Sequence, residues 1–309
     1  MNPKLSKVVV ILGVTASGKT DLAIKSARKF NGEIVSADSR QVYREFDIGT
    51  AKPDGRWMTA GGSRKFMSGG VIHHLVDMVD PKEDLSLSSY QKLAVEKLKD
   101  IAQRGRLPFL VGGTALYLKA VLENWSIPPV EPNPGLRRRL ENKTAADLFG
   151  ELQKKDPEAA AITGASNKRR IIRALEVIHQ TGRKFSEQRK TGRPIFDALK
   201  IGLKISRPEL DQRIARRTDE MLKNGLVEEI NRLRRKYPWD LVPMQSIDYQ
   251  EFKEFFEGKK TIGETIKTIN AHHLAYTRRQ MTWFKKDKDI NWITSEKEAA
   301  EKVENFLKE

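Results

Sequence analysis

One motif in the chain has residue types and a spacing that define a chemistry, the phosphate-binding pattern G-x-x-x-x-G-K-S/T. It reads Gly13-Val14-Thr15-Ala16-Ser17-Gly18-Lys19-Thr20. The glycines allow successive backbone N–H groups to turn toward phosphate oxygens, Lys19 adds a positive charge, and the Thr20 hydroxyl can hold Mg²⁺. The apolar block 7–12 before it and the helical spacing of apolar residues in 21–30 after it indicate a strand, a loop and a helix. We therefore expect a ligand with a diphosphate or triphosphate group.

A carboxylate, Asp38, follows the second predicted strand, 33–37. Parallel strands present their carboxyl ends along one crevice, so Asp38 is expected to face the phosphate-binding loop where an acceptor would sit. Proteins that hydrolyse nucleotides usually have an apolar strand that ends in an acid, whereas strand 107–111 here ends in Gly112-Gly113-Thr114. This pattern favours group transfer to a bound acceptor, with Asp38 as the general base. The alternative is that Asp38 caps a helix or binds Mg²⁺.

Positive charge is concentrated in segment 167–193, which holds nine Lys or Arg residues and two acids. Such a density on a helical segment favours contact with a phosphate backbone, and a solvated basic face is the alternative. A second basic cluster, Arg278-Arg279 with Lys285-Lys286, flanks Trp283-Phe284. Aromatic rings between cations suit stacking on unpaired bases, although helical spacing also suits a place in the core.

Composition narrows the class of protein. The 309 residues include 57 Lys or Arg against 41 Asp or Glu, a net charge of +16, which indicates a polyanionic partner. The absence of cysteine excludes disulfides and thiol-based metal or redox sites. The longest apolar run, 8–14, is far shorter than the ~20 residues of a membrane span, and it leads directly into the phosphate loop. We expect a cytoplasmic protein without a membrane partner, and a monomer.

The paired histidines His73-His74 do not predict a metal site. Neighbouring residues on a strand point to opposite faces, so the two rings cannot easily bind one ion. A hydrogen-bonded packing role beside Asp77 is the preferred interpretation.

The elements that position these residues alternate between strand and helix, which predicts an α/β fold with a parallel sheet and helices on both faces. Strands are expected at 7–12, 33–37, 107–111 and 198–205, and segment 53–70 as a loop. Proline-rich joints at 127–134 and 191–194 bound a small all-helical insertion, 128–195, within a core of 1–127 and 196–309. Helices are expected at 21–30, 88–104, 135–153, 157–163, 166–181, 207–224, 226–236, 249–256, 261–286 and 296–308.

Several blocks together resemble the bacterial tRNA dimethylallyltransferase family. They run in family order over nearly the whole chain. The blocks are Gly13–Thr20, S-A-D-S-R-Q-V-Y at 36–43, D-I-G-T-A-K-P at 47–53, H-H-L-V-D at 73–77, V-G-G-T at 111–114, R-R-x-x-R-A-L-E at 169–176, Arg213 and Arg217 before Met221 and Gly225-Leu226, and R-Q-x-T-W-F at 279–284.

The resemblance implies transfer of a dimethylallyl group from its diphosphate to N6 of adenosine 37, beside the anticodon of tRNA. It implies Asp38 as the general base, residues 13–20 with Mg²⁺ on the diphosphate, Thr114 and Arg217 beside the leaving group, and Gln41 as a residue that reads or splays the anticodon loop. The insertion would grip the anticodon stem-loop. The implied tRNA-contacting residues are Asp38, Ser39, Arg40, Gln41, Thr114, Arg137, Arg169, Arg170, Ile171, Ile172, Arg173, Arg278 and Arg279.

The chain departs from the family pattern at a few positions. Ala115 replaces a glycine, and the family's Ile-Gly-Tyr reads Ile247-Asp248-Tyr249. The family block T-R-Q-Y-A-K-R-Q reads H-L-A-Y-T-R-R-Q at 273–280, which replaces an arginine with Leu274.

Two other functions compete with transfer to tRNA. An adenylate isopentenyltransferase performs the same chemistry on a free nucleotide, but it would need neither the basic insertion nor the +16 charge. An RNA-binding P-loop NTPase should have an acid after strand 107–111, where this chain has glycine.

Overall fold

The computed structural model describes residues 5–60, 62–128, 130–188 and 190–309. The chain divides into two compact units. Met1–Leu122 and Ile195–Glu309 together form the first unit, and Glu123–Pro194 forms the second. The proline-rich joints predicted an insertion with the bounds 128–195. Among the helices so described, none is long and apolar enough to cross a membrane.

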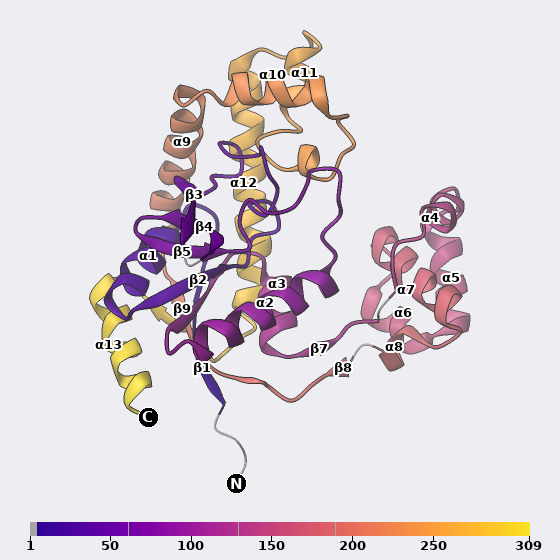
Figure 1. The fold of residues 1–309 in the computed structure, drawn as a ribbon. Helices are drawn as coiled ribbons and strands as arrows, with labels where there is room; N and C mark the ends of the chain where they lie inside the picture. The colour runs from indigo at the N-terminus through magenta and orange to yellow at the C-terminus, as the bar shows by residue number, and fades with distance from the viewer. Residues whose placement is uncertain (1–4, 61, 129, 189) are drawn as a thin grey trace. The chain divides into compact units, whose positions relative to one another are not determined.

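The first unit is built on an eight-stranded sheet with the order β10-β9-β1-β6-β2-β5-β4-β3. Figure 1 labels β1, β2, β3, β4, β5 and β9 of this sheet. The five strands from β9 to β5 in this order pair in parallel, and β10 joins β9 in parallel, which confirms the predicted α/β class. The strands are β1 (Ser6–Leu12), β2 (Gly32–Ser36), β3 (Gly55–Ala60), β4 (Ser63–Ser68), β5 (Val71–His74), β6 (Leu107–Gly112), β9 (Phe196–Leu203) and β10 (Asn291–Ile293).

Alternate residues of β1 point into two separate cores. Val8 and Val10 pack with helices α2 and α3 on one face of the sheet, whereas Val9 and Ile11 pack with α1 and α13 on the other. The helices of this unit are α1 (Lys19–Lys29), α2 (Leu87–Gln103), α3 (Ala115–Leu122), α9 (Arg207–Lys223), α10 (Leu226–Lys236), α11 (Phe252–Phe256), α12 (Ile262–Phe284), α13 (Glu296–Lys308) and the 3₁₀ turn η1 (Pro243–Gln245).

Segment 53–70 is not the loop that its Gly, Ser and basic residues predicted. It forms the antiparallel hairpin β3–β4, and β4 also pairs with β5. Trp57 faces Phe66 across the hairpin, with ring centroids 5.8 Å apart in an edge-on arrangement. The aromatic contact stabilises the hairpin, and so does the pairing of β4 with β5, a partner that lies outside segment 53–70.

The second unit contains α4 (Pro134–Glu141), α5 (Ala145–Lys155), α6 (Pro157–Thr163), α7 (Lys168–Thr181) and α8 (Phe185–Gln188). The single helix predicted over 135–153 is two helices, because the Thr144 side chain accepts a hydrogen bond from the Asp147 N–H and starts α5 anew. The unit is also not all-helical as expected, since β7 (Trp125–Ser126) pairs with β8 (Lys190–Thr191) where the chain enters and leaves. Its core includes Leu148, Leu152 and Leu175.

Candidate active site

The phosphate-binding loop joins β1 to α1 in the geometry that its motif requires. Ala16 and Gly18 have φ values of +62° and +89°, and α1 begins directly afterwards at Lys19. Only glycine adopts such a conformation without strain at position 18, and a Cβ there would also lie 3.3 Å from Nη1 of Arg213. The amino end of α1 therefore presents backbone N–H groups and a positive dipole to an anion.

Gln280 on α12 ties this loop to the neighbouring strand. Its side-chain oxygen accepts a hydrogen bond from the Thr15 N–H at 2.9 Å, and its amide nitrogen donates to the Gly113 carbonyl at 2.9 Å. Gln280 is 4% exposed, so both hydrogen bonds are shielded from water. Gln280 belongs to the R-Q-x-T-W-F block at 279–284, but the sequence did not predict a function for its side chain.

A pocket opens beside the start of α1, at the carboxyl ends of β2 and β6. Lys19, Thr20, Asp38 and Gln41 line its polar side. Its other walls are made by Ala23, Ile34, Ser36, Pro53, His73, Val76, Val111 and Gly112. The strand ends thus bring the predicted phosphate site and the predicted base to one cavity.

Lys19, which lines this pocket, interacts electrostatically with one carboxylate and one further cation. Burial lowers the pKa of Lys19 to about 8, with Asp38 opposing the shift and Arg217 adding to it. Within the described residues, the buried Nε of Arg217 has no hydrogen-bond partner. An anion bound beside Lys19 would favour the charged form of Lys19, and an anion that reached Nε of Arg217 would supply that group with a partner.

Asp38 also organises the turn that follows it. Its Oδ1 accepts hydrogen bonds from the backbone N–H groups of Arg40 at 2.8 Å and Gln41 at 3.3 Å. The Ser39 N–H donates to the Thr114 hydroxyl at 3.3 Å, which joins this turn to the end of β6. Within the described range 5–60, no helix begins after Asp38, so the helix-capping alternative is wrong. One carboxylate oxygen instead stabilises the turn 38–41, and Asp38 still lines the pocket.

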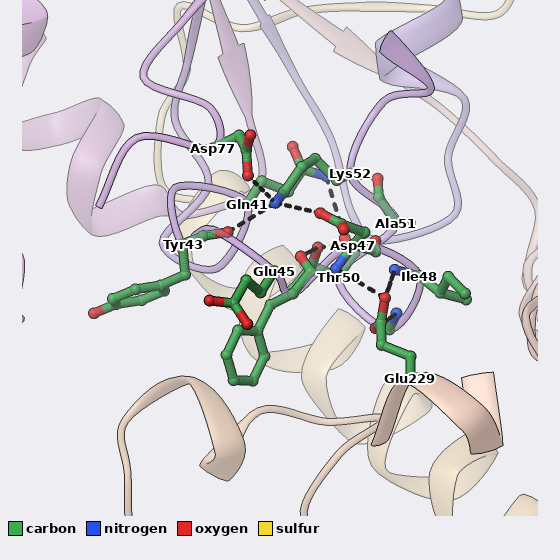
Figure 2. A network of polar contacts seen from close by, with 12 residues as sticks. Gln41, Tyr43, Glu45, Asp47, Ile48, Thr50, Ala51, Lys52, Asp77 and Glu229 are labelled. Atoms are coloured by element: carbon green, nitrogen blue, oxygen red, sulfur yellow. Dashed lines mark hydrogen bonds and ion pairs between the residues drawn. The ribbon is translucent and has the colours of Figure 1, made fainter. Parts of the chain in front are cut away.

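Gln41 points into the loop that contains the D-I-G-T-A-K-P block (Figure 2). Its amide nitrogen donates to the carbonyls of Thr50 at 3.2 Å and Ala51 at 2.9 Å. Lys52 anchors the end of the same loop, donating to the Tyr43 carbonyl and pairing with Asp77.

In the second unit, the predicted tRNA-contacting residues on α7 divide by exposure. Arg169 and Arg170 are exposed. Ile171 and Ile172 are 0% and 6% exposed in the core of the unit, so we remove their side chains from the candidate tRNA surface. Arg189, which contributes to the charge of segment 167–193, lies outside the described residues.

Arg137 and Arg173 are engaged by the buried carboxylate of Glu176. Arg137 donates to it at 2.8 and 2.9 Å, and Arg173 at 2.6 Å. Burial alone would raise the pKa of Glu176, but hydrogen bonds from Arg137, the Asn133 N–H and Arg173 hold it below its ordinary value. Arg137 therefore joins the start of α4 to α7, and Arg173 joins α7 to the Val130 carbonyl at 2.9 Å, roles that the sequence did not reveal.

The basic cluster on α12 keeps Arg278 and Arg279 exposed. Phe284 is buried in the core and Trp283 packs against it half-buried, which supports the core alternative for this pair. Leu274, which replaces the family arginine, packs against Val14 and Leu210 beneath the phosphate loop.

The two adjacent histidines have different environments. His74 contacts Glu33 at 2.7 Å, so its partner is Glu33 and not the expected Asp77. Burial lowers the pKa of His73 to about 4, with His74 adding to the shift and the Ser68 backbone opposing it. The described part of the chain contains no group of three His, Cys, Asp or Glu side chains that could hold a metal ion.

The parallel sheet, the phosphate-binding loop at its carboxyl edge and the carboxylate across the pocket define a P-loop α/β protein. The chain belongs to the IPP transferase family, because the family model of that description matches residues 41–287. The resemblance found in the sequence is thereby confirmed.

Individual relatives are similar in sequence to this chain over most of its length. It is 47% identical over 284 residues to a tRNA dimethylallyltransferase of Roseiflexus sp. (strain RS-1), with 90% of each chain covered. It is 37% identical over 299 residues to that of Bacillus subtilis (strain 168), with 95% and 92% covered.

Solved structures show the same fold. The tRNA isopentenylpyrophosphate transferase of Bacillus halodurans superposes with a TM-score of 0.70 at 36% identity, covering 98% of this chain and 96% of that one. A eukaryotic dimethylallyltransferase acting on tRNA gives a TM-score of 0.76 at 28% identity, covering 94% and 74%.

Proposed function

We propose that the protein transfers a dimethylallyl group from dimethylallyl diphosphate to N6 of adenosine 37 of tRNA and releases diphosphate. The observation that carries this proposal is the pocket that Lys19 and Thr20 of the phosphate loop line together with Asp38. Cations suit the diphosphate, and a carboxylate suits an amine that must lose a proton. Family membership supports the choice of substrates.

The chemistry follows from these groups. The bond between the allylic carbon and the diphosphate oxygen breaks as the bond to N6 forms, and the proton of the amine passes to Asp38. An adenine amine is a weak nucleophile and gains from a carboxylate that accepts its proton. Lys19, Arg217 and the N–H groups of the phosphate loop stabilise the charge that develops on the leaving diphosphate. We propose that Thr114, whose hydroxyl accepts a hydrogen bond from the Ser39 N–H in the turn after Asp38, lies beside the leaving group.

The residues present fit a Mg²⁺ ion. The hydroxyl of Thr20 and the carboxylate of Asp38 line the same pocket, and such oxygen ligands are the ones that Mg²⁺ prefers. Mg²⁺ commonly keeps several waters and substrate phosphates as ligands, so few protein ligands suffice. We propose that Thr20 holds the ion and that the bound ion neutralises charge on the diphosphate.

We propose that tRNA is the acceptor, bound by the turn 38–41 and by exposed arginines in both units. Arg169 and Arg170 on α7 and Arg278 and Arg279 on α12 are exposed, and the chain carries a net charge of +16. These features support binding to phosphate groups. A free nucleotide as acceptor would not require them. We also propose that the protein acts as a monomer, which light scattering checks.

One assay tests the proposal. Radiolabelled dimethylallyl diphosphate is incubated with Mg²⁺ and either unmodified tRNA or AMP, and the label on each acceptor is counted. We expect label on tRNA and none when adenosine 37 is replaced by guanosine. Label on AMP alone would replace the acceptor with a free nucleotide. Nucleotide hydrolysis without any label transfer would overturn the transferase function.

A further inference from the structure

A buried carboxylate from a distant part of the chain holds the loop that contacts Gln41. Glu229 on α10 is 6% exposed, and its neighbour Ile230 belongs to an apolar cluster that includes residues of α11 and α12. Its two oxygens accept hydrogen bonds from three successive backbone N–H groups and one phenol. The donors are Asp47 at 3.2 Å, Ile48 at 2.9 Å, Gly49 at 3.3 Å and the Tyr249 hydroxyl at 2.6 Å.

This arrangement fixes the turn 47–49 in one position. Three N–H groups that converge on one acceptor form an anion-binding concavity, and here the anion is part of the protein. Burial raises the pKa of Tyr249 well above its ordinary value, with the charge of Glu229 adding to the shift, so Tyr249 remains a donor. Gly49 lies against the Tyr249 ring, and a Cβ at 49 would be 2.5 Å from a ring carbon.

The fixed turn leads directly to the carbonyls that bind Gln41 (Figure 2). Thr50 and Ala51 follow the turn and accept both hydrogen bonds of the Gln41 amide group. On the far side, Lys52 pairs with Asp77 at 2.7 Å and its side chain is 4% exposed. The loop is therefore held at both ends, by Glu229 before these carbonyls and by Lys52 after them.

We propose that Glu229 is a positioning residue of the tRNA site, which acts by holding the loop 47–51 so that Gln41 presents itself to the anticodon loop. This inference rests on the proposed function, because it takes Gln41 as a tRNA-contacting residue. Glu229 lies 188 residues from Gln41 in the sequence and is not among the residues that line the pocket described above. Small displacements of a supporting loop have large effects on recognition, since a hydrogen bond weakens steeply when its donor and acceptor are misaligned.

The test is Glu229→Gln, which keeps the shape of the side chain but replaces one acceptor oxygen with an NH₂ donor that faces N–H groups. We expect the Kd for tRNA and the KM for tRNA to rise about tenfold, as for one lost charge-assisted hydrogen bond. The KM for dimethylallyl diphosphate should stay unchanged. Glu228→Gln removes the same charge from the exposed neighbour on α10 and should leave all three constants unchanged.

A double-mutant cycle with Gln41→Ala separates positioning from general stability. If Glu229 acts through Gln41, Glu229→Gln should change tRNA affinity less than about twofold once Gln41 is truncated. Equal effects of Glu229→Gln in both backgrounds would overturn the positioning role. Tyr249→Phe removes only one of the four hydrogen bonds, so it should weaken tRNA binding less than Glu229→Gln does. If Glu229→Gln fails to fold, the double-mutant cycle of Tyr249→Phe with Gln41→Ala tests the positioning role instead. A wild-type protein that binds tRNA but transfers no label overturns the proposed function instead.

Discussion

Nε2 of His273 on α12 lies 2.8 Å from Oδ1 and 2.9 Å from Oδ2 of Asp248, and both side chains are buried. Asp248 has a φ of +80°, a conformation that glycine adopts readily. The family pattern has glycine at this position and threonine at position 273. Two departures that are 25 residues apart in the sequence are therefore in direct contact, and together they form one buried polar pair.

This contact predicts that the two substitutions are coupled. Asp248→Gly leaves the His273 ring without its partner, and His273→Thr leaves a buried carboxylate, so each should lower the free energy of unfolding by about 2–4 kcal/mol. The double variant, which matches the family pattern, should lose clearly less than the sum. Urea unfolding of the four proteins measures this. Strict additivity within ~0.5 kcal/mol would contradict the coupling.

Asp38→Asn should preserve binding of tRNA and dimethylallyl diphosphate but slow transfer by roughly 10²–10⁴-fold, as for a lost general base. The amide can still accept the N–H of Arg40 through its oxygen, so the turn 38–41 should persist. Single-turnover transfer measures the chemical step directly. A rate close to that of the wild type would remove Asp38 from the role of base.

The affinity for diphosphate should depend on the protonation of Lys19. The pKa of Lys19 is about 8 in the free protein, and a bound anion favours the charged form and raises it. Binding then takes up a proton above pH 8, so affinity should be constant below about pH 7 and should fall as the pH rises through 8, by at most about tenfold per pH unit. Titration calorimetry from pH 7 to 9.5, in buffers of different ionisation enthalpy, measures the affinity for diphosphate and the number of protons taken up on binding. Lys19→Met should bind weakly with no such fall, and a pH-independent wild type would contradict the assignment.

Gln280 should control the shape of the phosphate loop. Gln280→Ala removes the acceptor of the Thr15 N–H and the donor to Gly113, and we expect diphosphate affinity to drop about 5- to 100-fold, as for an unsatisfied buried group. Gln280→Glu should bind more weakly still, because its second oxygen faces the Gly113 carbonyl and its charge opposes the ligand. Thr282→Ala, on the exposed side of the same helix, is the matched control. Wild-type affinity in both Gln280 variants would show that the tether is dispensable.

The exposed arginines of α7 should contribute binding energy without contributing to chemistry. Arg169→Ala with Arg170→Ala should weaken tRNA binding and reduce the slope of log K against log salt by somewhat less than one unit for each lost phosphate contact. Transfer at saturating tRNA should change far less than at limiting tRNA, because uniform binding energy enters KM.

Diphosphate binding by this variant should match that of the wild type. The pair Arg138→Ala and Arg139→Ala removes the same charge from exposed positions on α4 and controls for net charge alone. If filter-binding titrations give the two double variants the same slope, the specific clamp on α7 is rejected in favour of a general basic surface.

The sequence by itself determined the parts of this protein that depend on local pattern. The phosphate loop, the buried strand β1 and helix α2 follow from short-range spacing, because a glycine, a β-branched run or an apolar period of 3.6 acts within a few residues. The position of Asp38 at the pocket followed from one topological rule, the shared carboxyl edge of parallel strands.

Only the tertiary structure decided the contacts between segments far apart in the chain. The hairpin β3–β4 exists because β5 offers an edge to pair with, and the pattern of segment 53–70 does not contain that partner. Glu229 and Gln280 read as ordinary helical residues until the fold places loops 47–49 and 13–20 against them. The physical reason is that a backbone N–H group that is removed from water must find an acceptor. The side chain that accepts its hydrogen bond is selected by proximity in space, which sequence spacing does not encode.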